Sequence, residues 1–249
     1  MTPEAGFELV PAVTDAVQGR HATWRFIRNY TQAWNRPLHS GDGLDTFELT
    51  ALQTRLADGH PPIRRLPESL IESYALFGNA RDVTSNQDQL LTHHQVHVDP
   101  TGHALVLRTE NQGCAQWGIR LSDLDQDDPP TVMHLPSEPD RWRPHAPRWS
   151  LACLEFVLFE SLFRSPADDA DDPLWNTDSD ESTVTTIRQH YQQLPIPELP
   201  HWSLPTVHWY AGPDLLIRDE AQIWLWARGR TPEAVTPLQR LLRPPQRQP

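Results

Sequence analysis

The chain has 249 residues and a formal net charge of −12 at pH 7. This acidic balance argues against nucleic-acid binding, which needs a basic face to neutralise phosphates, and it is compatible with a basic protein partner. Hydrophobic residues make up 38% of the chain and include ten tryptophans, which excludes a wholly disordered protein.

No stretch approaches the roughly 18 to 20 apolar residues that a bilayer-spanning helix needs, and the first 20 residues carry no secretory signal. We therefore expect a cytoplasmic protein with no membrane contact. Two cysteines are too few for a disulfide framework. All basic residues are arginines, and the lack of lysine excludes a Walker-type phosphate loop and Schiff-base chemistry.

Amphipathic helices are expected in the first third of the chain, where apolar residues recur every three or four positions. This spacing places Trp24, Ile27 and Tyr30 on one face of the first helix. Pro67 is a favourable first helical residue, and Gly78 is expected to stop its helix in a left-handed conformation. The expected helices span about 23–34, 46–57 and 67–77.

The period then changes to that of short β-strands, at about 95–98, 104–109, 115–121 and 131–135. Asp99–Gly102 is a hairpin turn between the first two strands, and the order favours an antiparallel meander over βαβ units. Ser150 is expected to cap a strongly apolar helix at 151–163. This helix is expected to be buried on most of its circumference, at the centre of the core.

The acidic segment 165–182 carries seven carboxylates and no base, and it is expected to be a mobile linker or loop. Further elements are expected at about 182–194 (helix), 206–210, 215–218 and 222–227 (strands) and 232–242 (helix). The predicted fold class is α+β, with a mainly antiparallel sheet packed against several helices. The expected organisation is a core at 20–165, an acidic linker or loop at 166–182, and a region 183–249 that extends the same domain.

Three segments resemble motifs of the SUKH superfamily, in the same order and with similar spacing. Leu66–Gly78 reads LPESLIESYALFG, Glu110–Ile119 reads ENQGCAQWGI, and Asp127–Val132 reads DDPPTV. The resemblance covers roughly residues 46–163 and implies a SUKH-like core. It also implies a protein without catalytic activity. The family's eukaryotic founder is a cell-wall regulator, and many bacterial members are immunity proteins that each bind one toxin domain.

The second motif comprises Glu110, Asn111, Gln112, Gly113 and Trp117, which also have a physical interpretation of their own. Asn and Gly tolerate the positive φ of a tight connection, and side chains there bond back to the backbone. Trp117 is then expected to lie across the sheet and attach it to the helices. We interpret the motif as structural, with direct ligand contact as the alternative.

The residues expected to bind a partner are Asp123, Asp125, Asp127 and Asp128. A clustered acidic surface imitates phosphate and accelerates encounter with a basic protein, such as a toxin that acts on nucleic acid. The alternative is a solvated face that only keeps the protein soluble. No feature demands a dimer, so we expect a monomer.

The expected function is therefore that of a non-enzymatic protein-binding module, an immunity protein that neutralises a toxin domain of a bacterial polymorphic toxin system. Two alternatives remain open: an intracellular regulatory or scaffold protein, and a glycan or small-molecule binder. The second alternative would use a tryptophan-rich sheet face built from Trp202, Trp209, Trp224 and Trp226.

No catalytic group, metal or cofactor is expected. The sequence has no G-x-S-x-G nucleophile elbow, and Cys153 lies in an apolar helix stripe, where a thiol is inert. The densest histidine group comprises His93, His94, His97 and His103. No cysteine or carboxylate completes a zinc set locally, so these histidines are interpreted as solvated or hydrogen-bonded.

Overall fold

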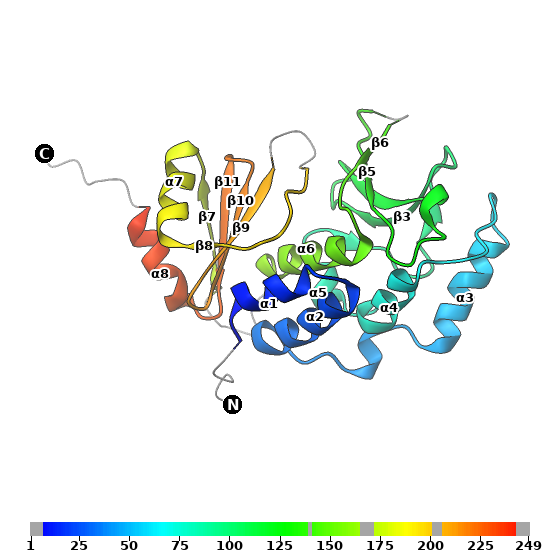
Figure 1. Ribbon diagram of the computed structural model, residues 1–249, viewed down its shortest axis with the longest axis horizontal. Helices are drawn as coiled ribbons and strands as arrows, with labels where there is room; N and C mark the ends of the chain where they lie inside the picture. Colours follow the sequence, from blue (N-terminus) through cyan, green and yellow to red (C-terminus); the bar gives the residue numbers. More distant parts are fainter. Residues whose placement is uncertain (1–6, 139–140, 165–171, 201–205, 243–249) are drawn as a thin grey trace, which may run out of the picture. The chain divides into compact units, whose positions relative to one another are not determined.

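The computed structural model describes residues 7–138, 141–164, 172–200 and 206–242 (Figure 1). Helices and two antiparallel sheets dominate these residues, which confirms the predicted α+β class. Residue contacts divide them into two compact units. The first unit holds Thr14–Arg164, and the second holds Glu8–Val13 together with the described residues from Asp172 onward.

The helices of the first unit begin and end close to the predicted positions. They are α2 (Arg20–Trp34), α3 (Thr46–Ala57), α4 (Glu68–Phe77), α5 (Arg81–Thr84) and α6 (Trp149–Leu162), with short 3₁₀ turns η1 (Ser40–Asp42) and η2 (Leu121–Asp123). The one-turn helix α5 was not predicted from the sequence. Nor was α1 (Leu9–Ala16), which spans the boundary between the two units.

The sheet of the first unit is antiparallel, with the strand order β1-β3-β4-β5-β6 and with β2 paired to β3. Its strands are β1 (Gln89–Leu90), β2 (His97–Val98), β3 (Ala104–Thr109), β4 (Gln116–Arg120), β5 (Val132–His134) and β6 (Trp142–Pro144). From β3 to β6 the strands follow one another in both sequence and sheet, which confirms the predicted meander.

α6 is the central helix of the first unit, and all but two of its residues are buried, as predicted. On one side it contacts α2, α4 and α5. Aromatic rings make part of this core: the Phe156 ring lies 5.9 Å from that of Phe77 and 6.1 Å from that of Trp149. Phe156 of the apolar helix therefore packs against aromatic rings on α4 and on α6 itself.

Gly78 ends α4 in a right-handed conformation, with φ −59° and ψ −24°, so the prediction of a left-handed stop is wrong. A glycine is required there for another reason. A Cβ at this position would lie 2.7 Å from the carbonyl oxygen of Tyr74. The requirement is thus close backbone packing and not a positive φ.

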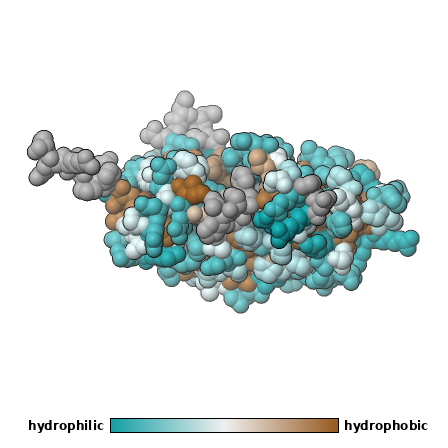
Figure 2. Space-filling model, turned by 90° about the horizontal axis from the view of Figure 1, so that it is seen from above, coloured by the Kyte–Doolittle hydropathy of each residue, from teal (hydrophilic) through white to brown (hydrophobic). Residues whose placement is uncertain are grey.

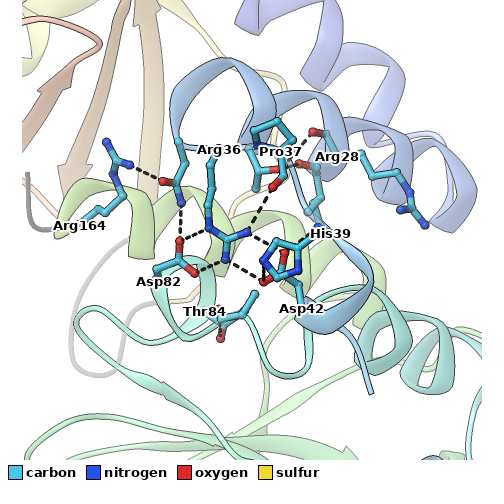
Figure 3. A network of polar contacts seen from close by, with 12 residues as sticks. Arg28, Arg36, Pro37, His39, Asp42, Asp82, Thr84 and Arg164 are labelled. Atoms are coloured by element: carbon cyan, nitrogen blue, oxygen red, sulfur yellow. Dashed lines mark hydrogen bonds and ion pairs between the residues drawn. The ribbon is translucent and has the colours of Figure 1, made fainter. Parts of the chain in front are cut away.

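Arg36 connects the end of α2 to η1 and α5 (Figure 3). Its guanidinium donates two hydrogen bonds of 2.7 Å to Asp42, and hydrogen bonds of 2.7 and 2.9 Å to Asp82. These bonds hold the pKa of Asp42 below its usual value. A planar fork of five N–H donors suits two carboxylates at once, so this residue fixes the path of the chain after α2.

The second unit is a separate sheet with the order β7-β11-β10-β9-β8. Its elements are β7 (Leu174–Asp178), α7 (Glu181–His190), β8 (Gln192–Gln193), β9 (Val207–Gly212), β10 (Leu215–Glu220), β11 (Trp224–Gly229) and α8 (Pro232–Leu241). One sheet face packs against the helices through Ile187, Tyr210, Ile217, Leu225 and Leu238. These strands form a sheet of their own and do not pair with the first sheet.

The acidic segment predicted to be a linker or loop falls partly outside the described residues, at 165–171. Within the described part, Leu174–Asp178 forms β7, which pairs with β11, and Asp180 caps α7 by accepting a 2.7 Å hydrogen bond from the Thr183 N–H. This part of the segment is therefore regular structure. Leu174 and Trp175, the two large apolar residues of the segment, lie in the strand.

The surface shown in Figure 2 is mostly hydrophilic, with apolar side chains in small separate groups. Among the described residues, the exposed large hydrophobic side chains are Phe47, Ile223 and Trp224. The last two are neighbours in the chain, at the start of β11.

Candidate functional site

The acidic turn between β4 and β5 carries the four carboxylates predicted to bind a partner. It exposes Asp125 and Asp127, with Asp123 half-buried between η2 and the turn. Asp123 accepts hydrogen bonds from the Ser122 hydroxyl at 3.4 Å and from Gln126 Nε2 at 3.3 Å. Both partners of Asp123 belong to the same turn. Asp123, Asp125 and Asp127, three of the four predicted carboxylates, therefore lie on one surface turn.

Asp127 connects this turn to neighbouring helices. Its carboxylate lies 3.0 Å from Arg65 Nη2 and 3.9 Å from Arg20 Nη1, and its backbone oxygen accepts a 2.9 Å hydrogen bond from the Ser69 N–H near the start of α4. The Asp127 side chain is 55% exposed. Ion pairs at such positions contribute little to stability, so they orient a carboxylate that stays open to solvent.

Asp128 caps α6. Its Oδ1 accepts a 2.9 Å hydrogen bond from the Ser150 N–H, and its Oδ2 accepts one of 2.5 Å from the Ser150 hydroxyl. The carboxylate thus faces free N–H groups at the helix N-terminus, which stabilise an anion. The prediction that Ser150 itself is the N-cap is wrong: α6 begins at Trp149, and Ser150 lies in its first turn. Asp128 therefore stabilises the start of α6, and its carboxylate is less available to a partner than those of Asp125 and Asp127.

Two glutamates of α4 extend the acidic turn. Glu68 and Glu72 both pair with Arg20, and the Glu72 carboxylate lies 3.2 Å from Arg20 Nε. Together with the exposed aspartates they form a surface that we call the acidic face: Glu68, Glu72, Asp123, Asp125 and Asp127. Its five carboxylates are accompanied by the guanidinium groups of Arg20 and Arg65, so the acidic face keeps a net negative charge.

The turn between β3 and β4 is formed by the second motif. Glu110 Oε2 accepts hydrogen bonds from the N–H groups of Gln112 at 2.8 Å and Cys114 at 2.9 Å. Gly113 has a φ of +78°, a value that favours glycine. Glu110 is buried, whereas Asn111 and Gln112 are exposed. The buried carboxylate and the glycine therefore shape the turn.

Trp117 of β4 lies opposite Arg108 of β3 and is 8% exposed, which confirms its predicted burial. The Arg108 guanidinium carbon lies 4.9 Å from the centre of the Trp117 ring and 5.4 Å from that of Phe156 on α6. Cation–π contacts on both sides attach the sheet to the helix through Arg108. Gly118 allows β3 and β4 to approach, because a Cβ there would lie 2.2 Å from the Leu105 carbonyl oxygen.

Arg108 belongs to a buried ionic cluster with Asp88 and Glu160. Its Nη2 lies 2.8 Å from Glu160 Oε1 and 3.1 Å from Asp88 Oδ2. Glu160 also accepts hydrogen bonds from the N–H groups of Asn86 at 2.7 Å and Gln87 at 2.6 Å. Burial raises the pKa of Asp88 to about 6, and the Arg108 charge offsets only part of this rise. One guanidinium thus faces two carboxylates.

This cluster was not predicted from the sequence. Glu160 lies 52 positions from Arg108 and 72 positions from Asp88 in the sequence. The three residues are isolated in the sequence and form no local pattern. His145 lies nearby, with its ring 6.3 Å from that of Trp117. Burial, and then the Arg108 charge, lower the pKa of His145 to about 3, so its imidazole is neutral at neutral pH.

The tryptophan-rich sheet face lies in the second unit. Trp209 and Trp226 both pair in register with Arg218, so the three side chains share one face, as predicted for the two tryptophans. Trp209 is 2% exposed and Trp226 is half-buried, whereas Trp224 is 42% exposed. Trp202 lies outside the described residues.

The histidine-rich segment has no metal-binding geometry within the described ranges, where no group of three His, Cys, Asp or Glu side chains is placed to hold an ion. His93 is buried, and this burial lowers its pKa. His97 Nδ1 lies 2.9 Å from the Gln95 carbonyl oxygen, and His103 Nδ1 lies 2.7 Å from the Thr101 hydroxyl. Each of these rings therefore has a local partner at its Nδ1 atom.

No family model matches the chain, and no curated protein or solved structure matches it. In the part of the chain that the structure describes, none of the helices combines the length and the apolar character needed to cross a bilayer.

Proposed function

We propose that this protein is a non-enzymatic binding module of the immunity type, which neutralises a basic toxin domain of a bacterial polymorphic toxin system. The observation that carries the proposal is the acidic face, where five carboxylates accompany two guanidinium groups. The resemblance of three segments to SUKH motifs supports the same function, because many bacterial members of that superfamily bind toxin domains.

Asp125 is the most available charge of the acidic face. It is exposed and forms no ion pair with any residue of the described ranges. A toxin that cleaves nucleic acid holds phosphates with positive charge, and exposed carboxylates attract the same surface. Such complementarity mainly accelerates association and selects the partner.

A glycan binder is less well supported. Aromatic side chains bind sugars by stacking, and the tryptophan-rich face offers one well-exposed indole among its described residues, that of Trp224. Trp209 is buried to 2% exposure and does not present its ring. A regulatory scaffold would use the same acidic face, and it differs from the proposal in having no toxin partner.

The double substitution Asp123→Asn and Asp125→Asn is expected to slow association with the basic toxin domain proposed as the partner. Steering by several charges changes association rates by factors of 10 to 10³, so two charges are expected to account for about a threefold to tenfold loss at low salt. Asparagine keeps an acceptor oxygen, so the melting temperature is expected to stay unchanged. Stopped-flow association at several salt concentrations measures the effect.

The matched control is Asp15→Asn, which removes an exposed carboxylate that pairs with Arg25, a residue outside the acidic face. This control is expected to leave the association rate nearly unchanged. An association rate that ignores both salt and the Asp123/Asp125 substitutions would place the binding surface elsewhere.

A further inference from the structure

A row of side chains across β7, β11 and β10 places an exposed indole between two carboxylates. Trp224 of β11 pairs in register with Asp178 of β7 and with Glu220 of β10. Residues directly opposite each other on antiparallel strands project from the same face, with Cβ atoms about 4.5 to 5.5 Å apart. Trp224 therefore has Asp178 on one side and Glu220 on the other.

The two carboxylates are engaged differently. Glu220 Oε1 lies 2.9 Å from Arg218 Nη1, and Glu220 Oε2 accepts a 2.8 Å hydrogen bond from Trp226 Nε1. Asp178 is exposed and has no ion pair with a residue that the structure describes. The charge of Glu220 is thus compensated within the sheet, whereas Asp178 leaves a negative charge beside the indole.

The aromatic surface is held in place before any ligand arrives. The rings of Trp224 and Trp226 lie 6.1 Å apart. The β10–β11 hairpin turns at Ala221 and Gln222, whose φ values of +57° and +60° are those of a tight hairpin turn. The Gln222 N–H donates a 3.1 Å hydrogen bond to Asp219 Oδ1, which fixes the turn next to the exposed indole.

We propose that Trp224 and Asp178 together bind an arginine side chain of a basic protein partner, an inference that takes the existence of such a partner from the proposed function. A guanidinium stacks on the face of an indole and donates hydrogen bonds to a carboxylate in the same plane. Asp180 and Glu181 are exposed two and three residues beyond Asp178 and add negative charge along the chain.

A neutral sugar would fit this surface less well, because it would stack on the indole and gain nothing from the charge of Asp178. The exposed side chain of Ile223 adjoins Trp224 in the chain and offers apolar contact to an aliphatic stem. The site thus combines an aromatic surface, a free carboxylate and an apolar neighbour, which are the groups that an arginine side chain contacts along its length.

The test is a titration of the full chain, labelled with ¹⁵N-tryptophan, with the peptide acetyl-Gly-Arg-Gly-Arg-Gly-amide. The indole N–H resonance of Trp224 is assigned by its loss in Trp224→Leu. It is expected to shift saturably with this peptide and not with the same peptide carrying citrulline, which keeps the shape of arginine and lacks its charge.

Asp178→Asn is expected to weaken this binding about twofold to fivefold, the range for one exposed ion pair, whereas Asp15→Asn is expected to leave it unchanged. The proposal is overturned if the resonance does not move, if it moves equally with the citrulline peptide, or if Asp178→Asn has no effect. The titration contains no toxin. Its failure therefore leaves the acidic-face experiment untouched, and failure to bind a toxin does not alter its outcome.

Discussion

Glu160→Ala is expected to lower the free energy of unfolding by about 3 to 5 kcal/mol, the range for removing one partner of a buried ion pair. The Glu160 side chain is fully buried and lies 2.8 Å from Arg108 Nη2. Its loss leaves Arg108 Nη2 with Asp88 Oδ2 at 3.1 Å. It also frees the N–H groups of Asn86 and Gln87, each of which is costly to leave unsatisfied when buried.

Urea unfolding of the wild type and the variant measures this difference. Asp15→Ala is the control, because Asp15 and Arg25 form an ion pair with both side chains more than half exposed, and such pairs are worth about 0 to 1 kcal/mol. The triple variant Asp88→Asn, Arg108→Met and Glu160→Leu removes all three charges of the cluster and is expected to recover part of the loss, with the N–H groups of Asn86 and Gln87 still without their acceptor. A Glu160→Ala variant as stable as the wild type would contradict the structural role of the buried ionic cluster.

Trp117→Ala is expected to cost about 3 to 5 kcal/mol, as for a large core aromatic. The substitution removes the ring that lies 4.9 Å from the Arg108 guanidinium and opens a cavity between the sheet and α6. It also removes the indole that packs on the Arg108 guanidinium of the buried ionic cluster. Thermal and urea unfolding both measure the loss.

Trp224→Ala is the matched control for Trp117→Ala, since it deletes the same side chain at a position that is 42% exposed. It is expected to cost less than about 1 kcal/mol, as for a surface substitution. If the two variants lost the same free energy of unfolding, burial of Trp117 on β4 would not explain its contribution to stability.

The local sequence predicted most helices of the first unit because each carries a long apolar period and clear end signals. α3 begins and ends at the predicted residues 46 and 57, and β3 at 104 and 109. The two-residue strands β1 and β8 were not predicted, because their pairing depends on a neighbouring strand and not on their own pattern. For the same reason the sequence did not show that β7–β11 form a sheet of their own.

The candidate site was predictable only in part. The positions of Asp123, Asp125 and Asp127 in the acidic face follow from a run of aspartates, which is a local signal, whereas Glu68 and Glu72 join them from α4. The role of Asp128 does not follow from the run, because its partner Ser150 is 22 residues away and the contact exists only when α6 is in place. The buried ionic cluster is even less predictable from the sequence. Arg108 lies in a mostly apolar strand, and its carboxylate partners come from two other segments of the chain.

The measurement that tests the proposed function most directly is co-expression of the chain with a candidate toxin domain from a reading frame next to its gene, followed by affinity capture and size determination. We predict a one-to-one complex and survival of cells that the toxin alone kills, with both lost as the acidic face is neutralised by substitution. Capture of the chain without the toxin, in cells that die as quickly as those lacking the chain, would contradict the account.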